Sequence, residues 1–240
     1  NLGEVVSPDF YLTVNVNLST TWEQLKEELP ERVKLLAVSK GHSASSIREL
    51  VEIGQRDFGE SRLQEALPKI QDLSDITRIC WHFIGRLQAN KVRAVVRNFS
   101  IIHSVDSPEL AKRISRIAGE ENRSVKVMLQ VKLRHDPKKT GLAPGCLKEV
   151  IPEILKLPHL QLIGLMTIAP LGFSKTTRRS LYKECRYLAN DFGLSECSMG
   201  MSDDWREAVL EGSTWVRLGS ILFGPRPNHI SLSRDTIKTI

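Results

Sequence analysis

Short apolar runs alternate with amphipathic stretches along most of the chain. The runs are rich in Val, Ile and Leu, which is typical of parallel strands buried on both faces. The stretches between them are roughly ten to fifteen residues long with apolar positions at helical spacing, so the pattern indicates repeated strand–helix units. The strands that it predicts are Val33–Val38, Arg56–Phe58, Ile79–Ile84, Ile101–Val105, Val125–Val131, Leu160–Thr167, Cys197–Met199 and Trp215–Leu218.

A helix is expected before the first strand and in each interval between strands. Eight strands with intervening helices predict closure into a single (β/α)8 barrel, the TIM-barrel class of α/β fold, with an extra N-terminal helix. An open, doubly wound sheet is the alternative, although its usual nucleotide-binding motifs, G-x-G-x-x-G and G-x-x-x-x-G-K-[ST], are missing. The expected helices are Thr20–Leu29, with Thr20 as N-cap, Ser45–Ile53, Arg62–Leu73, Asn90–Arg97, Pro108–Gly119, Leu147–Leu157, Lys175–Phe192 and Asp203–Leu210.

The length of the chain indicates how it is divided into domains. Its 240 residues suit one barrel, a fold that typically takes about 250 residues. We expect residues 1–18 to form an N-terminal arm, residues 19–228 to form the barrel, and residues 229–240 to form a C-terminal tail.

Composition and charge indicate which kinds of binding partner and which cellular compartment to expect. The net charge is +6, but basic and acidic residues are interleaved without an aromatic–basic cluster, so we expect no nucleic acid and a surface that attracts phosphorylated small molecules. The sequence contains no run of about 18 apolar residues, so we expect no membrane span. Residues 1–17 do not resemble a signal peptide. The four cysteines show no C-x-x-C spacing, which predicts free thiols in a reducing cytoplasm and no metal site.

Candidate chemistry begins at Lys40, directly after the apolar run Leu35–Val38. The functional site of such a barrel lies at the carboxyl ends of its strands. An amine at the mouth of an apolar barrel is partly desolvated, which lowers its pKa and leaves a neutral amine that can condense with an aldehyde. A solvated lysine at a strand end is the alternative interpretation.

Glycine-containing turns follow the last two predicted strands, at Ser198–Ser202 and Arg217–Ser220. Loops after the seventh and eighth strands form the common phosphate site of this fold, and backbone amides and hydroxyls suit that role. Tight turns that need glycine for their geometry are the alternative. Arg217 lies inside the last strand, and if it points inward it needs a ligand or carboxylate partner, because an unpaired interior charge is costly.

Several blocks along the chain match, in order, those of a known family. They are Leu36–Lys40, Phe58–Glu60, Trp81–Gly85 with Leu87–Lys91, His103–Asp106, Gly164–Met166, Ser198–Asp203, and Val216–Gly219 with Phe223-Gly224. With these blocks the chain, from Val33 to Arg226, resembles the pyridoxal-phosphate homeostasis protein family (YggS/PROSC type).

The resemblance implies a barrel similar to the N-terminal domain of alanine racemase, the type III fold of pyridoxal-phosphate proteins. It also implies that pyridoxal 5′-phosphate is held as a Schiff base on Lys40, with Arg217 at the pyridine nitrogen and Met166 lining the ring pocket. Ser61 stands where the family usually has asparagine, so a cofactor contact from that position depends on the serine hydroxyl.

The resemblance further implies a set of phosphate contacts after the last two strands. Ser198, Gly219 and Ser220 would hold the phosphate, and amides around Met199 and Gly200 would assist. Ser220 replaces a threonine that is common in the family, which preserves the hydroxyl.

The resemblance implies a protein that buffers or delivers pyridoxal phosphate in the cell and affects amino-acid and keto-acid balance. A racemase needs a second acid/base, supplied in alanine racemase-like enzymes by a tyrosine from an added domain. Tyr11, Tyr182 and Tyr187 fall outside the predicted barrel-mouth loops, and Pro225–Ile240 contains no tyrosine. We therefore expect no catalytic residue. We also expect a cytoplasmic monomer, with apo-enzymes as possible acceptors of pyridoxal phosphate. A weak racemase and a cofactor-free Schiff-base aldolase are the alternatives.

Overall fold

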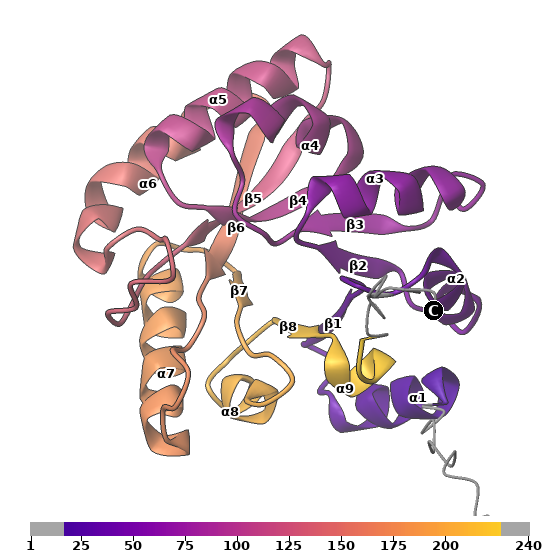
Figure 1. Ribbon diagram of the computed structural model, residues 1–240. Helices are drawn as coiled ribbons and strands as arrows, with labels where there is room; N and C mark the ends of the chain where they lie inside the picture. The colour runs from indigo at the N-terminus through magenta and orange to yellow at the C-terminus, as the bar shows by residue number, and fades with distance from the viewer. Residues whose placement is uncertain (1–16, 227–240) are drawn as a thin grey trace, which may run out of the picture.

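The computed structural model describes residues 17–226, which form a closed barrel of eight parallel strands (Figure 1). The strands follow one another in chain order, and β8 closes the barrel by pairing with β1. The prediction of a (β/α)8 barrel is confirmed. The strands are β1 (Lys34–Val38), β2 (Asp57–Glu60), β3 (Cys80–Phe83), β4 (Ile101–Val105), β5 (Val125–Gln130), β6 (Leu160–Met166), β7 (Glu196–Ser198) and β8 (Trp215–Leu218).

Helices surround the strands on the outside of the barrel (Figure 1). The extra N-terminal helix is present as α1 (Leu18–Glu28), and it packs against α2 (Ala44–Glu52) and α9 (Ser220–Phe223). Within residues 17–226, no helix has the length and apolar character needed to cross a membrane. The remaining helices are α3 (Leu63–Asp72), α4 (Val92–Asn98), α5 (Pro108–Glu120), α6 (Leu147–Leu155), α7 (Lys175–Asp191) and α8 (Trp205–Leu210).

The ends of some elements differ from the prediction. Asn17 is the N-cap of α1, and its side chain accepts a hydrogen bond from the Thr20 amide at 3.1 Å, so the choice of Thr20 as N-cap was wrong. The helix α9 and the 3₁₀ turns Ala89–Lys91 and Pro144–Cys146 were not predicted, because elements of three or four residues are too short to show periodicity. The predicted arm and tail fall mostly or wholly outside the described residues.

Apolar side chains pack in two separate regions. The larger cluster lies between the strands and the helices, as expected for strands buried on both faces. The smaller cluster fills the barrel interior and consists of Leu36, Ile101, Met128, Met166 and Trp215. Ile84 and Ile168 pack on this inner cluster and also line the cavity described below, so the inner cluster supports the floor of the site.

Candidate functional site

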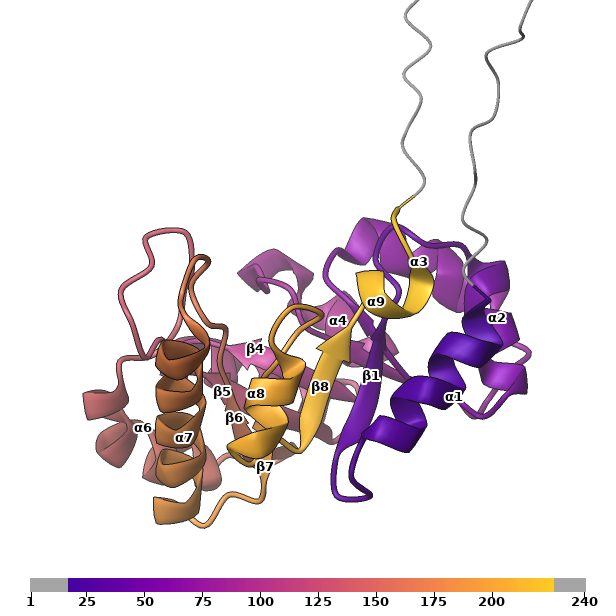
Figure 2. The same cartoon turned by 90° about the horizontal axis from the view of Figure 1, so that it is seen from below.

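A cavity of about 510 Å³ opens at the carboxyl ends of the strands, where the sequence predicts the site. In Figure 2, β1 and β8 run side by side toward this end, and α9 follows β8 there. The lining residues come from many strand ends: Val38, Lys40, Ser61, Ile84, Gly85, Arg86, Gln130, Lys138, Lys139, Thr140, Ile168, Met201, Ser202, Asp203, Arg217, Gly219, Ser220 and Arg226.

The cavity wall carries a strong excess of positive charge. Asp203 is the one acidic residue among the lining residues. A concave surface lined by charges of one sign concentrates ligands of the opposite sign, so this cavity favours an anion such as a phosphate ester. The cationic lining residues are Lys40, Arg86, Lys138, Lys139, Arg217 and Arg226.

Lys40 lies on the cavity wall in the turn that follows β1. Burial lowers the pKa of Lys40, and the charges of Arg226 and Arg62 lower it further, while Glu65 opposes them. A lysine acts as a nucleophile when its amine is deprotonated, so these surroundings increase the reactive fraction of Lys40 at neutral pH.

The backbone on both sides of Lys40 is held by a buried ion-pair network. The Lys69 ammonium donates to the Ser39 carbonyl and to the Glu60 carboxylate, each at 2.8 Å, and the Ser39 hydroxyl donates to the same carboxylate at 2.6 Å. On the other side of Lys40, the amide of the next residue donates to Glu65, which also pairs with Lys69. Burial raises the pKa of Glu60, and the Lys69 and Ser39 hydrogen bonds oppose that rise.

Arg217 points into the barrel interior and reaches the cavity wall from below. Its Nη1 donates to the Ser198 Oγ at 2.8 Å, and its Nη2 donates to the Thr167 carbonyl at 3.0 Å. Burial lowers the pKa of this guanidinium. Throughout residues 17–226 no carboxylate forms an ion pair with Arg217, so a hydroxyl and a carbonyl provide the partners that an interior arginine requires.

The structure divides the predicted site residues into two groups. One group is distributed around the cavity wall, where its side chains and backbone can contact a ligand directly. This group consists of Lys40, Ser61, Arg217, Gly219 and Ser220.

The second group, Met166, Ser198, Met199 and Gly200, lies behind the cavity wall. Met166 belongs to the apolar cluster of the barrel interior, and Ser198 is completely buried with its hydroxyl engaged in hydrogen bonds. The Met199 amide donates to the Trp215 carbonyl at 3.1 Å, so this amide is not free to bind a ligand. Gly200 forms the turn behind the wall with a φ of +96°.

Several cationic residues of the cavity were missed by the sequence analysis. Arg86 follows β3, and its place at a strand end is a signal that could have identified it. Lys138 and Lys139 lie in the long segment between β5 and α6, where the Leu142 amide donates to the Gln130 carbonyl at 2.8 Å and returns the loop to the barrel. These two lysines carry no motif by which the sequence could place them at the site.

The tyrosines that fall within the described residues do not line the cavity. The Tyr182 hydroxyl in α7 donates to Asp204 at 2.6 Å, and burial raises its pKa. Tyr187 is 65% exposed on the same helix. Neither tyrosine is therefore placed to act as the second acid/base of a racemase, and Tyr11 lies outside the described residues.

Residues of metal-ligating type come together at the opposite end of the barrel. Donor atoms of Asp57, Cys80 and His82 lie within 4.8 Å of one another. A 2.9 Å hydrogen bond between His82 Nε2 and Asp57 Oδ1 accounts for the approach of that pair. Burial raises the pKa of the Cys80 thiol to about 11, which keeps the thiol protonated at neutral pH. The hydrogen bond explains the Asp57–His82 pair, and we assign no ion to the group.

The described barrel matches a known family over its whole length. Residues 16–227 match the family described as alanine racemase, N-terminal domain. A relative from Synechocystis sp., named pyridoxal phosphate homeostasis protein, is 45% identical over 213 residues, which cover 86% of this chain and 98% of the relative. The chain belongs to the pyridoxal phosphate homeostasis protein family. A family member of the same name from Pseudomonas aeruginosa is 42% identical over 82% of this chain and 86% of its own.

Solved structures agree with this family membership. PipY of Synechococcus elongatus PCC7942, solved without PLP, has a TM-score of 0.85 and 46% identity, covering 86% of this chain and 100% of its own. The same protein solved with PLP bound has a TM-score of 0.83 and 45% identity over the same shares. An alanine racemase from Clostridium difficile 630 has a TM-score of 0.69 and 21% identity, covering 89% of this chain and 57% of its own, and it shows a likeness of fold alone.

Proposed function

We propose that this protein binds pyridoxal 5′-phosphate in the cation-lined cavity and holds it reversibly through Lys40, in order to buffer or deliver the cofactor within the cell. The observation that carries the proposal is a partly desolvated lysine with a lowered pKa in a cavity rich in cations. Such a pair of features matches a ligand that has both an aldehyde and a phosphate. The family relatives named for pyridoxal phosphate homeostasis support the proposal.

The residues of the cavity fit this cofactor by their chemistry. Bound pyridoxal phosphate supplies an aldehyde that reacts with a neutral amine. The Ser220 hydroxyl and the backbone at Gly219 would hold the phosphate after β8, with Arg226 adding charge, and the Ser61 hydroxyl would face the ligand after β2. Met166, Ser198, Met199 and Gly200 would then act from behind the wall, supporting the floor, Arg217 and the turn after β7.

Arg217 favours holding the cofactor over catalytic turnover. A guanidinium donates hydrogen bonds and cannot accept them, so Arg217 would donate to the pyridine nitrogen and leave it unprotonated. An unprotonated ring nitrogen withdraws electrons weakly, which suits racemisation at best and disfavours transamination. This preference supports the proposed role as a cofactor carrier.

We also infer the setting in which the protein works. All four cysteines are free thiols, which suits the reducing cytoplasm. The cavity is formed from the residues of one chain, so a monomer can hold the ligand without a partner subunit. Apo-enzymes that need pyridoxal phosphate are the acceptors that we propose.

The experiment is a titration with pyridoxal phosphate followed by absorption near the visible edge, then reduction with borohydride and mass spectrometry. We expect the wild-type protein to show a new band and a stable adduct on Lys40, and both to be lost in Lys40→Ala. Lys139→Ala is the control, because it removes another lysine from the same cavity. An unchanged band and adduct mass in Lys40→Ala, or no band in the wild-type protein, would contradict the proposal.

A further inference from the structure

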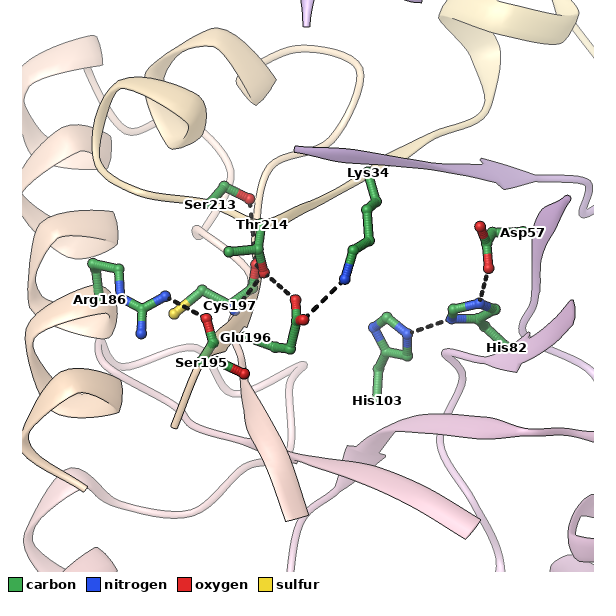
Figure 3. A network of polar contacts seen from close by, with 10 residues as sticks. All are labelled: Lys34, Asp57, His82, His103, Arg186, Ser195, Glu196, Cys197, Ser213 and Thr214. Atoms are coloured by element: carbon green, nitrogen blue, oxygen red, sulfur yellow. Dashed lines mark hydrogen bonds and ion pairs between the residues drawn. The ribbon is translucent and has the colours of Figure 1, made fainter. Parts of the chain in front are cut away.

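A chain of hydrogen bonds crosses the barrel interior and ends at Arg217. His82 Nε2 lies 2.9 Å from Asp57 Oδ1, and His82 Nδ1 lies 2.9 Å from His103 Nε2. His103 Nδ1 is 2.8 Å from the Ser198 Oγ, which also accepts from Arg217 Nη1 at 2.8 Å. Figure 3 shows its first part, with Asp57, His82 and His103 in a row. This series of hydrogen bonds thereby connects the start of β2, at the amino end of the barrel, with the wall of the cavity.

The members of this chain differ sharply in burial. His82, His103 and Ser198 are completely buried, and Arg217 is 4% exposed. The Asp57 side chain is 29% exposed, so it is the member that contacts solvent. A buried polar atom without a partner is costly, and both imidazole rings have a partner at each nitrogen. The interior of this barrel therefore contains a fully connected polar network among apolar side chains.

The donor and acceptor roles along the chain follow from its Asp57 end. An ionised carboxylate accepts and never donates, so His82 carries its proton on Nε2. Burial lowers the pKa of His82 and His103, so both rings are neutral, and a neutral ring that donates from Nε2 accepts at Nδ1. His103 then donates from Nε2 to His82 and accepts at Nδ1 from the Ser198 hydroxyl, whose oxygen accepts from Arg217.

We propose that Asp57, His82, His103 and Ser198 form a positioning relay that holds the Arg217 guanidinium in one orientation at the cavity wall. The relay and the Thr167 carbonyl hold two nitrogens of the guanidinium. The Asp57 carboxylate sets the direction of every hydrogen bond between itself and Arg217. The effect on cofactor binding rests on the proposed function, since the relay acts on the ligand through Arg217.

The first test measures the protonation of the two relay histidines in the absence of cofactor. In ¹⁵N-histidine NMR spectra of the wild-type protein at neutral pH, we expect neutral rings with Nε2–H for both His82 and His103. Asp57→Asn should shift the nitrogen signals of His103. Removing the carboxylate charge weakens the hydrogen bond to His82, and the hydrogen bond from His103 to His82 is then less strongly polarised. Glu196→Gln is the matched control, since Glu196 is a carboxylate at the same end of the barrel that bonds Lys34 and lies outside the relay (Figure 3).

The outcomes of this NMR test are decisive even if a variant fails to fold. A charged ring or an Nδ1–H form at either histidine of the wild-type protein overturns the relay. Unchanged His103 signals in folded Asp57→Asn also overturn it.

The second test reads the effect on the cofactor. We expect Ser198→Ala to bind pyridoxal phosphate roughly fivefold more weakly, since one of the two bonds to Arg217 is lost. The absorption maximum of the bound cofactor should also shift, which a loss of fold stability alone does not cause. Asp57→Asn should change both in the same direction by less, and Glu196→Gln should change neither.

The two proposals fail in different ways. If the wild-type protein binds no pyridoxal phosphate, the proposed function fails, and the NMR measurement decides on the relay by itself. If the wild-type protein binds the cofactor and Ser198→Ala matches it in affinity and spectrum, the positioning role is overturned.

Discussion

The reactivity of Lys40 depends on a combination of burial and neighbouring charge. Burial contributes the largest part of the lowered pKa, and Arg226 and Arg62 add to it through the repulsion of a second positive charge. The buried Lys69–Glu60 pair holds the backbone beside this lysine. The desolvation of Lys40 and the position of its backbone therefore depend on different parts of the barrel, and each can be changed separately.

Replacing Arg226 tests the charge contribution to this pKa. In Arg226→Met the repulsion is lost, so the pKa of Lys40 should rise toward its ordinary value of 10.5. The neutral fraction of Lys40 falls, and its reaction with an uncharged amine-specific reagent becomes slower at pH 7 to 8. The measurement is the pH dependence of labelling at Lys40 by mass spectrometry.

Arg93→Met is the control for that measurement, because Arg93 pairs with Glu120 and Glu121 on the outer helices. An uncharged reagent avoids any effect of the substitution on phosphate binding. A labelling profile of Arg226→Met that coincides with the wild-type profile would show that Arg226 does not act on Lys40.

At the scale of elements, the turn after β7 joins a strand of the site to the helix α8. Gly200 has a φ of +96°, and a Cβ atom there would lie 2.7 Å from the Ala208 Cβ and 2.9 Å from the Trp205 Cα. The carbonyl of Gly200 also accepts from the Arg217 amide at 3.0 Å. The glycine thus permits both the left-handed turn and the close approach of α8 to the barrel.

Gly200→Ala should destabilise the fold by about 2 to 4 kcal/mol, the sum of backbone strain and overpacking. Gly172→Ala is the matched control. Gly172 has a φ of +83°, and a Cβ atom added there would meet nothing within 4 Å, so strain alone should cost about 1 kcal/mol. Urea unfolding measures both variants. Equal losses would mean that the contact with α8 contributes nothing.

At the scale of the whole molecule, the neutral histidines in the barrel interior link stability to pH. The folded pKa values of His82 and His103 lie below the ordinary value of 6.5, chiefly because of burial. Below pH 6.5 the unfolded chain therefore binds protons that the folded protein does not. Stability should fall as the pH decreases from 6.5, and these two groups should contribute nothing to its pH dependence well above 6.5.

The expected slope is about 1.4 kcal/mol per pH unit for each histidine that stays neutral in the folded state. Glu60 acts in the opposite direction at lower pH, because burial raises its pKa. The measurement is the free energy of unfolding of the ligand-free protein between pH 7 and 5, compared with His103→Gln, whose slope should be smaller. Exposed His135 provides the control variant His135→Gln. Identical slopes in wild-type and His103→Gln would contradict the prediction.

The alternation of apolar runs and amphipathic stretches predicted the strands and the longer helices, because the periodicity of burial is a local property of each segment. Closure into a barrel was inferred from the number of strands, with an open sheet as the alternative, and the pairing of β8 with β1 decides it. The same local information placed Lys40 and the turn at Gly219 at the carboxyl ends of strands, where the structure has them. Ordered sequence blocks further indicated the pyridoxal phosphate homeostasis family, which the 45% identity to a member of that family over 213 residues confirms.

Only the tertiary structure decided which strand-end residues face the cavity and which lie behind it. Ser198 and Met199 follow the predicted pattern of a phosphate turn, yet Ser198 is the last residue of β7 and points into the barrel, and Met199 packs in the outer core. Lys138 and Arg226 also line the cavity, although they lie outside the sequence motifs, at the two places where the loop before α6 and the segment after α9 return to the site. The polar chain from Asp57 to Arg217 likewise joins strands far apart in sequence, because closure of the barrel brings their inward-facing side chains together.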